Sequence, residues 1–260
     1  MDAIGALGVG HIGGCLSLAD LLAVLYFGGH MRIDPANPKM AGRDRLVMSK
    51  GHAGPAVYAA LAEKGFFPAE LLATLNRPGT NLPSHCDMNR TPGIDMTTGS
   101  LGQGISCAVG VALGSRLRGD GATVFAVVGD GESQEGQVWE AAMYAAHLRL
   151  SRLIAFTDYN RMQIDGSTNE INSLDELPAK WTAFGWNAVN VDDGNDVGQI
   201  HHAILDARSC PDKPSMIVLN TVKGKGVSFA EKAGCGSHNM PVTPEQYKEA
   251  LAELARGGDR

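Results

Sequence analysis

The sequence lacks the apolar run that a membrane span requires, which is roughly 20 consecutive residues. Its N-terminus has no basic region followed by an apolar core and a cleavage site, so we expect no signal peptide and a cytoplasmic location. Basic residues are also few: 22 Lys and Arg stand against 28 Asp and Glu, for a net charge of −6. We therefore expect neither a membrane nor a nucleic-acid partner. A small anionic ligand would need help from backbone dipoles or a metal.

Cysteine is sparse, and no pair has the C-x-x-C spacing that indicates zinc or a redox dithiol. The five cysteines are far apart and odd in number, so we expect them to be reduced. Glycine, in contrast, is abundant, with 33 residues, which indicates many tight turns and close backbone approaches. Several of these glycines stand beside His, Asp or Asn, and a functional site is expected there.

Short apolar runs alternate along the chain with longer helical patterns, as is typical of a parallel sheet covered by helices on both faces. We therefore predict an α/β fold, a doubly wound parallel sheet, in one domain over 1–260; two smaller domains are the alternative. The predicted strands are Arg45–Ser49, Thr123–Val128, Leu153–Asp158, Asn187–Val191 and Ser215–Leu219. The predicted helices are Leu18–Phe27, Ala53–Lys64, Pro68–Leu75, Leu101–Arg118, Glu135–Leu148, Asp175–Phe184, Asp196–Ala207 and Pro244–Ala255.

Two stretches fit neither pattern. Asn76–Thr98 is rich in Pro, Gly, Asn, His and Thr, and Val222–Val242 holds Lys, Gly, Ser and His. Long irregular loops in a compact domain are usually functional. In a doubly wound sheet, ligands bind beyond the carboxyl ends of the strands, and we expect both loops to reach that edge.

Two oxygen donors follow neighbouring predicted strands. Gly129-Asp130-Gly131 comes directly after one strand, and Asn160 follows the end of the next, 30 positions further on. Mg²⁺ prefers carboxylate, amide and carbonyl oxygens together with phosphate and water. Asp130, Asn160 and a backbone carbonyl just beyond could form half of such a shell. Gly-Asp-Gly taken by itself is also a common strand-ending turn.

Four of the eight histidines lie where a strand or loop meets a glycine-rich segment: His11, His52, His85 and His238. Together they would provide hydrogen bonds and proton transfer near neutral pH, which suits sugar-phosphate chemistry. The other four match no pattern, and we expect them in helices or on the surface: His30, His147, His201 and His202.

The segment from Gly129 to Gly166 resembles the thiamine-diphosphate motif of transketolases over about 38 positions, through Gly-Asp-Gly, Glu135-Gly136 and Asn-Arg-Met-Gln-Ile-Asp-Gly. Gly10-His11-Ile12-Gly13-Gly14, Gly51-His52, His85 and Thr97 to Gly104 also match that family. The resemblance covers nearly the whole chain but only the first of three transketolase domains. It implies thiamine diphosphate and Mg²⁺ as cofactors.

The resemblance also implies roles for individual residues. Asp130, the Asn160 side chain and the Met162 carbonyl bind Mg²⁺, and the Gly131 amide contacts the diphosphate. His52 and His238 contact the diphosphate, His238 also reaches substrate, and His11 and His85 bind substrate hydroxyls. Residues lining the cofactor are Gly99, Ser100, Leu101 and Ile164. Glu135 matches an acid in a carboxylate network between subunits; alternatively it is a first-turn Glu favoured by the helix dipole.

From the resemblance, we expect the pyrimidine-binding and C-terminal domains to be absent from this chain. In the family, the Glu that activates the cofactor belongs to the second domain, and no counterpart is evident here. We therefore expect the partner to be a C-terminal transketolase subunit, in an α₂β₂ assembly that moves a ketol unit between sugar phosphates. The alternatives are 1-deoxyxylulose-5-phosphate synthase-like chemistry, 2-oxo acid decarboxylation, or a non-catalytic cofactor-binding domain.

Overall fold

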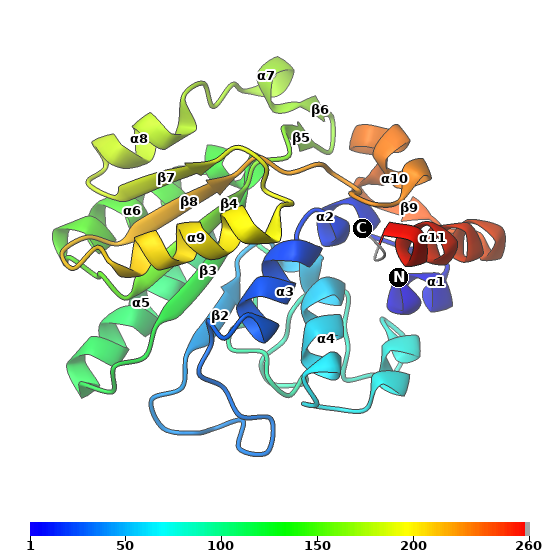
Figure 1. Cartoon of the computed structure of the whole chain (residues 1–260), viewed down its shortest axis with the longest axis horizontal. Coiled ribbons are helices and arrows are strands. Elements are labelled where there is room, and N and C mark those ends of the chain that lie inside the picture. Colours follow the sequence, from blue (N-terminus) through cyan, green and yellow to red (C-terminus); the bar gives the residue numbers. More distant parts are fainter. Residues whose placement is uncertain (258–260) are drawn as a thin grey trace.

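A five-stranded parallel sheet forms the centre of the computed structural model, which describes residues 1–257 (Figure 1). The last three residues of the predicted domain lie outside the described residues. The strand order is β2-β3-β4-β8-β7. The predicted α/β class is thereby confirmed, and each predicted strand is present with ends within one residue of the prediction. The strands are β2 Arg45–Met48, β3 Val124–Gly129, β4 Leu153–Asp158, β7 Asn187–Val191 and β8 Ser215–Leu219.

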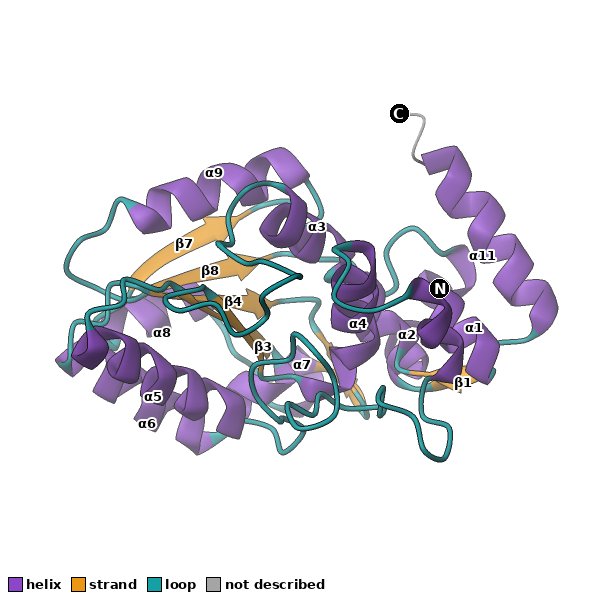
Figure 2. Ribbon diagram, turned by 90° about the horizontal axis from the view of Figure 1, so that it is seen from below, coloured by secondary structure: helices purple, strands orange, loops and turns teal. Residues whose placement is uncertain are grey.

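Helices cover both faces of this sheet and extend beyond one edge of it (Figures 1 and 2). One buried cluster joins the sheet to α3, α4 and α9, and the other joins it to α5, α6 and α8. Strands β3 and β4 are buried at every position, which accounts for their β-branched and apolar sequences. The α-helices are α1 Asp2–Leu7, α2 Ile12–Leu16, α3 Ala19–Phe27, α4 Gly54–Glu63, α5 Gln103–Arg118, α6 Gly136–His147, α7 Thr168–Ile171, α8 Leu177–Ala183, α9 Val197–Arg208, α10 Ser228–Ala233 and α11 Pro244–Gly257.

Short elements account for the differences from the sequence prediction. The segment predicted as a helix over Pro68–Leu75 is a 3₁₀ helix over Ala69–Thr74, in which only Leu72 is buried. Other 3₁₀ turns are η1 Gly51–Ala53, η3 Gly131–Gln134 and η4 Gly234–His238. The loop predicted over Val222–Val242 holds α10, η4 and the short strand β9 Met240–Pro241, which pairs with β1 Val9–Gly10. A two-residue hairpin, β5 Met162–Gln163 with β6 Gly166–Ser167, follows β4.

The carboxyl ends of the parallel strands meet at one edge, because neighbouring strands run in register. Met48 pairs with Val127, and Gly129 pairs with Asp158, which in turn pairs with Leu219. The segments that follow β2, β3, β4 and β8 therefore lie together. Within residues 1–257, we find no helix that is both long and apolar enough to cross a membrane.

Candidate functional site

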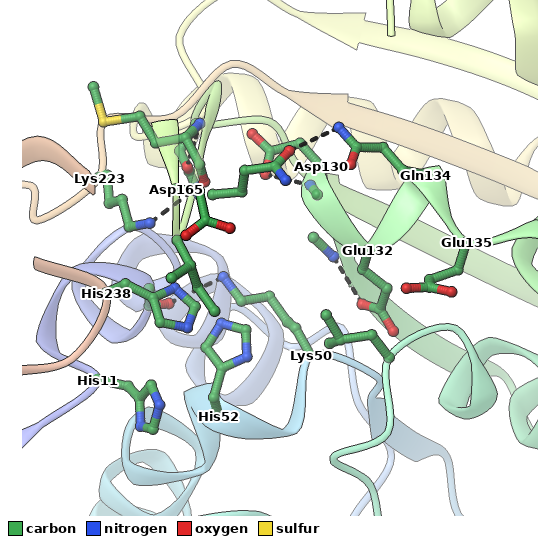
Figure 3. Close-up of a pocket in the computed structure, with 18 of the residues that line it drawn as sticks. His11, Lys50, His52, Asp130, Glu132, Gln134, Glu135, Asp165, Lys223 and His238 are labelled. Atoms are coloured by element: carbon green, nitrogen blue, oxygen red, sulfur yellow. Dashed lines mark hydrogen bonds between the residues drawn. The ribbon is translucent and has the colours of Figure 1, made fainter. Parts of the chain in front are cut away.

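A pocket of about 420 Å³ lies at this edge of the sheet (Figure 3). It is lined by segments that follow β2, β3, β4 and β8, together with the start of α2 and the loops that carry His85 and Gly99. The structure brings together all but one of the predicted site residues here: His11, His52, His85, Gly99, Leu101, Asp130, Gly131, Glu135, Asn160, Met162, Ile164 and His238. Ser100 is exposed and does not line the pocket.

Asp130 has a carboxylate oxygen without a hydrogen-bond partner in residues 1–257. The residue is 3% exposed, and the Gly131 amide donates to Oδ1 at 2.8 Å, while the buried Oδ2 accepts no hydrogen bond from any of those described residues. Burial, followed by the nearby carboxylate of Asp158, raises the pKa of Asp130 to about 7. A buried anionic oxygen is costly unless a cation compensates it, so the carboxylate fits a metal ligand.

The other two predicted metal ligands lie beside Asp130 and already make hydrogen bonds. Asn160 Oδ1 accepts from the Met162 amide at 3.1 Å, and Lys223 Nζ donates to the Met162 carbonyl at 3.4 Å. Each oxygen has a second lone pair for a cation. Lys223 is 4% exposed and lines the pocket, and burial, followed by the charge of Lys50, lowers its pKa.

Glu132 connects three glycine-rich segments. Its Oε1 accepts from Ser49 Oγ at 2.5 Å and from the Gly102 amide at 2.8 Å, and its Oε2 accepts from the Gly129 amide at 2.9 Å. Burial raises the pKa of Glu132, against the opposing effect of these donors. The positive end of α5 is therefore neutralised in part by a protein carboxylate.

Lys50, which lines the pocket, forms a buried ion pair with Asp158, and the two side chains are 3% and 0% exposed. Asp158 also accepts from Ser17 Oγ at 2.6 Å and from Thr221 Oγ1. Burial alone would raise the pKa of Asp158, but Lys50 and the two hydroxyls outweigh it and hold that pKa below its usual range. The pair joins segments 108 residues apart in the sequence.

Sequence reasoning gave no role to Lys50, Glu132, Asp158 or Lys223. Lys50 directly precedes the Gly51-His52 match, and Asp158 ends the predicted strand before Asn160. For Lys50 and Asp158, a usable signal is a charged residue at or just beyond the end of an apolar strand, where burial demands a partner.

The four predicted histidines form one cluster. The ring centroid of His11 lies 5.4 Å from that of His52, 5.6 Å from that of His85 and 5.3 Å from that of His238. Burial is the leading cause that lowers the pKa of each ring. The pKa of His52 lies well below its usual range, and the pKa of His238 falls to about 4. The cluster is therefore neutral at pH 7 and can both donate and accept hydrogen bonds.

Two residues at the rim of the pocket are open to solvent. Ile164 is 65% exposed, and Glu135 is exposed at the N-cap of α6. Elsewhere, the expectation that His30 lies in a helix or on the surface is wrong. His30 follows α3, is 5% exposed and forms a 2.9 Å hydrogen bond with His201 of α9, because α3 and α9 pack together.

The fold and the pocket together define an α/β cofactor-binding domain whose ligand site lies beyond the carboxyl ends of parallel strands. The family model described as "Transketolase, thiamine diphosphate binding domain" matches residues 1–255. The chain therefore belongs to the transketolase thiamine-diphosphate-binding-domain family.

Two curated relatives are similar along nearly their whole length. The 6-deoxy-6-sulfo-D-fructose transketolase subunit SqwG of Clostridium sp. (strain MSTE9) is 60% identical over 99% of this chain and 93% of its own. An apulose-4-phosphate transketolase subunit of Phocaeicola vulgatus is 40% identical over 95% of this chain and 86% of its own.

Solved transketolases share the fold but are longer. The crystal structure of the Pichia stipitis enzyme in complex with sedoheptulose 7-phosphate has a TM-score of 0.91 and 33% identity, covering 98% of this chain and 39% of that one. The Campylobacter jejuni enzyme has a TM-score of 0.89 and 29% identity. This chain spans about two-fifths of the length of these structures.

Proposed function

We propose that this chain is the N-terminal subunit of a two-chain transketolase. It binds the diphosphate of thiamine diphosphate through Mg²⁺ and, with a C-terminal subunit, transfers a two-carbon ketol unit from a ketose phosphate to an aldose phosphate. The observation that carries this proposal is the Asp130 carboxylate oxygen that has no hydrogen-bond partner within the described residues and lies in the same pocket as the four clustered histidines. The two relatives of similar length, both named as transketolase subunits, support it.

Within the chain, the Asp130 carboxylate, Asn160 Oδ1 and the Met162 carbonyl would hold Mg²⁺. Thiamine diphosphate, when bound, supplies the nucleophilic carbon that a ketol transfer requires. His52 and His238 would donate hydrogen bonds to diphosphate oxygens. The neutral rings of His11 and His85 would bind sugar hydroxyls and could hold or move a proton there.

Calorimetry tests the cofactor site. Thiamine diphosphate and Mg²⁺ are titrated into the wild-type chain, Asp130→Ala and the control Asp192→Ala. Asp192 follows β7 at the same sheet edge but does not line the pocket. We expect Asp130→Ala to abolish Mg²⁺-dependent binding and Asp192→Ala to preserve it. Equal binding by Asp130→Ala and wild type would remove the metal site.

A partner subunit with the pyrimidine-binding and C-terminal domains would complete an α₂β₂ assembly in the cytoplasm. The exposed Ile164 and Glu135 at the pocket rim support this proposal, since another chain can cover them. Size-exclusion chromatography with light scattering on the mixed subunits should give the mass of two copies of each. Two separate peaks at the masses of the free chains would contradict the assembly.

A second candidate for the donor is 6-deoxy-6-sulfo-D-fructose, because the relative named for that sugar is 60% identical to this chain. Coupled assays of the assembled enzyme would compare this donor with xylulose 5-phosphate and pyruvate. Turnover of either sugar supports ketol transfer, and the ratio of the two rates ranks the two donors. Turnover of pyruvate alone would instead favour a synthase-like or decarboxylating reaction.

A further inference from the structure

Asp158 is enclosed by the residues of the site without lining the pocket itself. It ends β4, has no exposed surface, and pairs in register with Gly129 of β3. Its backbone carbonyl accepts from the Asp130 amide at 3.2 Å, and its side chain contacts that of Asn160. The residue therefore adjoins two of the three proposed metal ligands.

Asn160 presents its amide in one orientation. Nδ2 donates to Asp158 Oδ2 at 3.1 Å, while Oδ1 accepts from the Met162 amide at 3.1 Å. Turning the amide over would set its oxygen against the carboxylate and its NH₂ against the Met162 N–H. Both contacts would then be repulsive. The Asp158 carboxylate and the Met162 amide therefore fix the orientation of the Asn160 amide group.

Asp158 can only accept hydrogen bonds, because its partners hold it as a carboxylate. Lys50 balances its charge, and the hydroxyls of Ser17 and Thr221 complete its hydrogen bonds. An ionised carboxylate offers no donor, so it orients the Asn160 NH₂ toward itself.

We propose that Asp158 is a positioning residue, which fixes the amide of Asn160 so that Oδ1 is presented to the metal ion. The inference rests on the proposed function, which names Asn160 as a ligand. Asp158 would touch neither metal nor substrate. Its removal should nevertheless weaken metal binding about 10- to 100-fold, the range typical for residues that orient a ligand.

The test uses Mn²⁺ as the probe, because it shares the preference of Mg²⁺ for oxygen ligands and is detected by electron paramagnetic resonance. Mn²⁺ is titrated into the chain with saturating thiamine diphosphate. The variants are Asp158→Ala, Asp158→Ala with Asn160→Asp, and Asp130→Ala. A carboxylate at position 160 presents an oxygen whichever way it turns, and it supplies Lys50 with a new counter-charge.

We expect Asp158→Ala to weaken Mn²⁺ binding and the added Asn160→Asp to restore it to within a few-fold of wild type. Because Asn160→Asp also compensates Lys50, the comparison is repeated with Lys50→Met in both variants, where only the presented oxygen is restored. The inference would be overturned if Asp158→Ala bound Mn²⁺ like wild type, or if the double variant bound Mn²⁺ as weakly as Asp158→Ala. If Asp130→Ala binds Mn²⁺ like wild type, the proposed metal site fails instead.

Thermal melting checks that each variant folds. Should Asp158→Ala not fold because Lys50 is left uncompensated, the comparison with Lys50→Met in both Asp158→Ala variants decides alone. In that background, stronger Mn²⁺ binding with Asn160→Asp supports the positioning role. Equal Mn²⁺ binding with and without Asn160→Asp contradicts the positioning role.

Discussion

At the scale of single residues, the histidine cluster links the site to the stability of the fold. Burial, followed by the charges of Lys223 and neighbouring histidines, lowers the pKa of His238 to about 4. The unfolded chain, with an ordinary histidine pKa near 6.5, therefore binds a proton that the folded chain does not. This contribution to stability is complete above pH 6.5 and is lost as the pH falls toward 4.

We predict that His238→Gln flattens the pH dependence of the free energy of unfolding in that window. Glutamine cannot titrate, so the slope should fall by up to about 1.4 kcal/mol per pH unit, the value for one proton. Urea unfolding at pH values from 4.5 to 8 measures the slope. Wild type and variant should differ by a constant amount above pH 7; parallel curves throughout would show that His238 titrates normally in the fold.

At the scale of elements, α5 packs its first turn directly against the end of β2. A Cβ on Gly104 would lie 2.5 Å from Ser49 Cα, which leaves no room for a methyl group. Gly110, two turns further along the same helix, has nothing within 4 Å of such a Cβ and is exposed. Gly104 and Gly110 are therefore a crowded and an open position in the same helix, and alanine substitutions at the two can be compared directly.

We predict that Gly104→Ala destabilises the chain by about 1–3 kcal/mol, the usual cost of overpacking. Gly110→Ala should stabilise it by about 0.5–1 kcal/mol, because alanine loses less backbone entropy in a helix. Urea unfolding at pH 7 measures both. A Gly104→Ala variant as stable as Gly110→Ala would show that the close contact with β2 is not maintained.

The centre of the sheet could be predicted from the sequence because β3 Val124–Gly129 and β4 Leu153–Asp158 are fully buried, mostly apolar runs that end at a glycine and an aspartate. The short elements α2, α10 and the β5–β6 hairpin could not. Helices of one or two turns and strands of two residues carry too little periodicity, and contacts with the rest of the chain determine them.

The site, like the fold, could be predicted from the sequence only in part. The motif residues Asp130 and Asn160 could be found because their spacing follows one strand-helix-strand unit. Glu132 and Asp158 act through partners distant in the sequence, such as Ser49 at 83 residues and Lys50 at 108. No local pattern encodes those contacts.

At the scale of the whole molecule, the proposed function gives the chain one side of a site that another chain would complete. The proposed metal ligands and the four histidines line one pocket, with Ile164 65% exposed at its rim. The chain covers 93% of the length of a relative named as a transketolase subunit but only 39% of the length of a solved transketolase. Partner dependence is thus the central claim.

The most direct measurement is ketol-transfer activity as this chain is titrated into a fixed amount of the partner subunit. The account predicts negligible activity from either chain alone, a rise that saturates at equal amounts, and no activity when the added chain carries Asp130→Ala. Robust ketol transfer by this chain alone would contradict it.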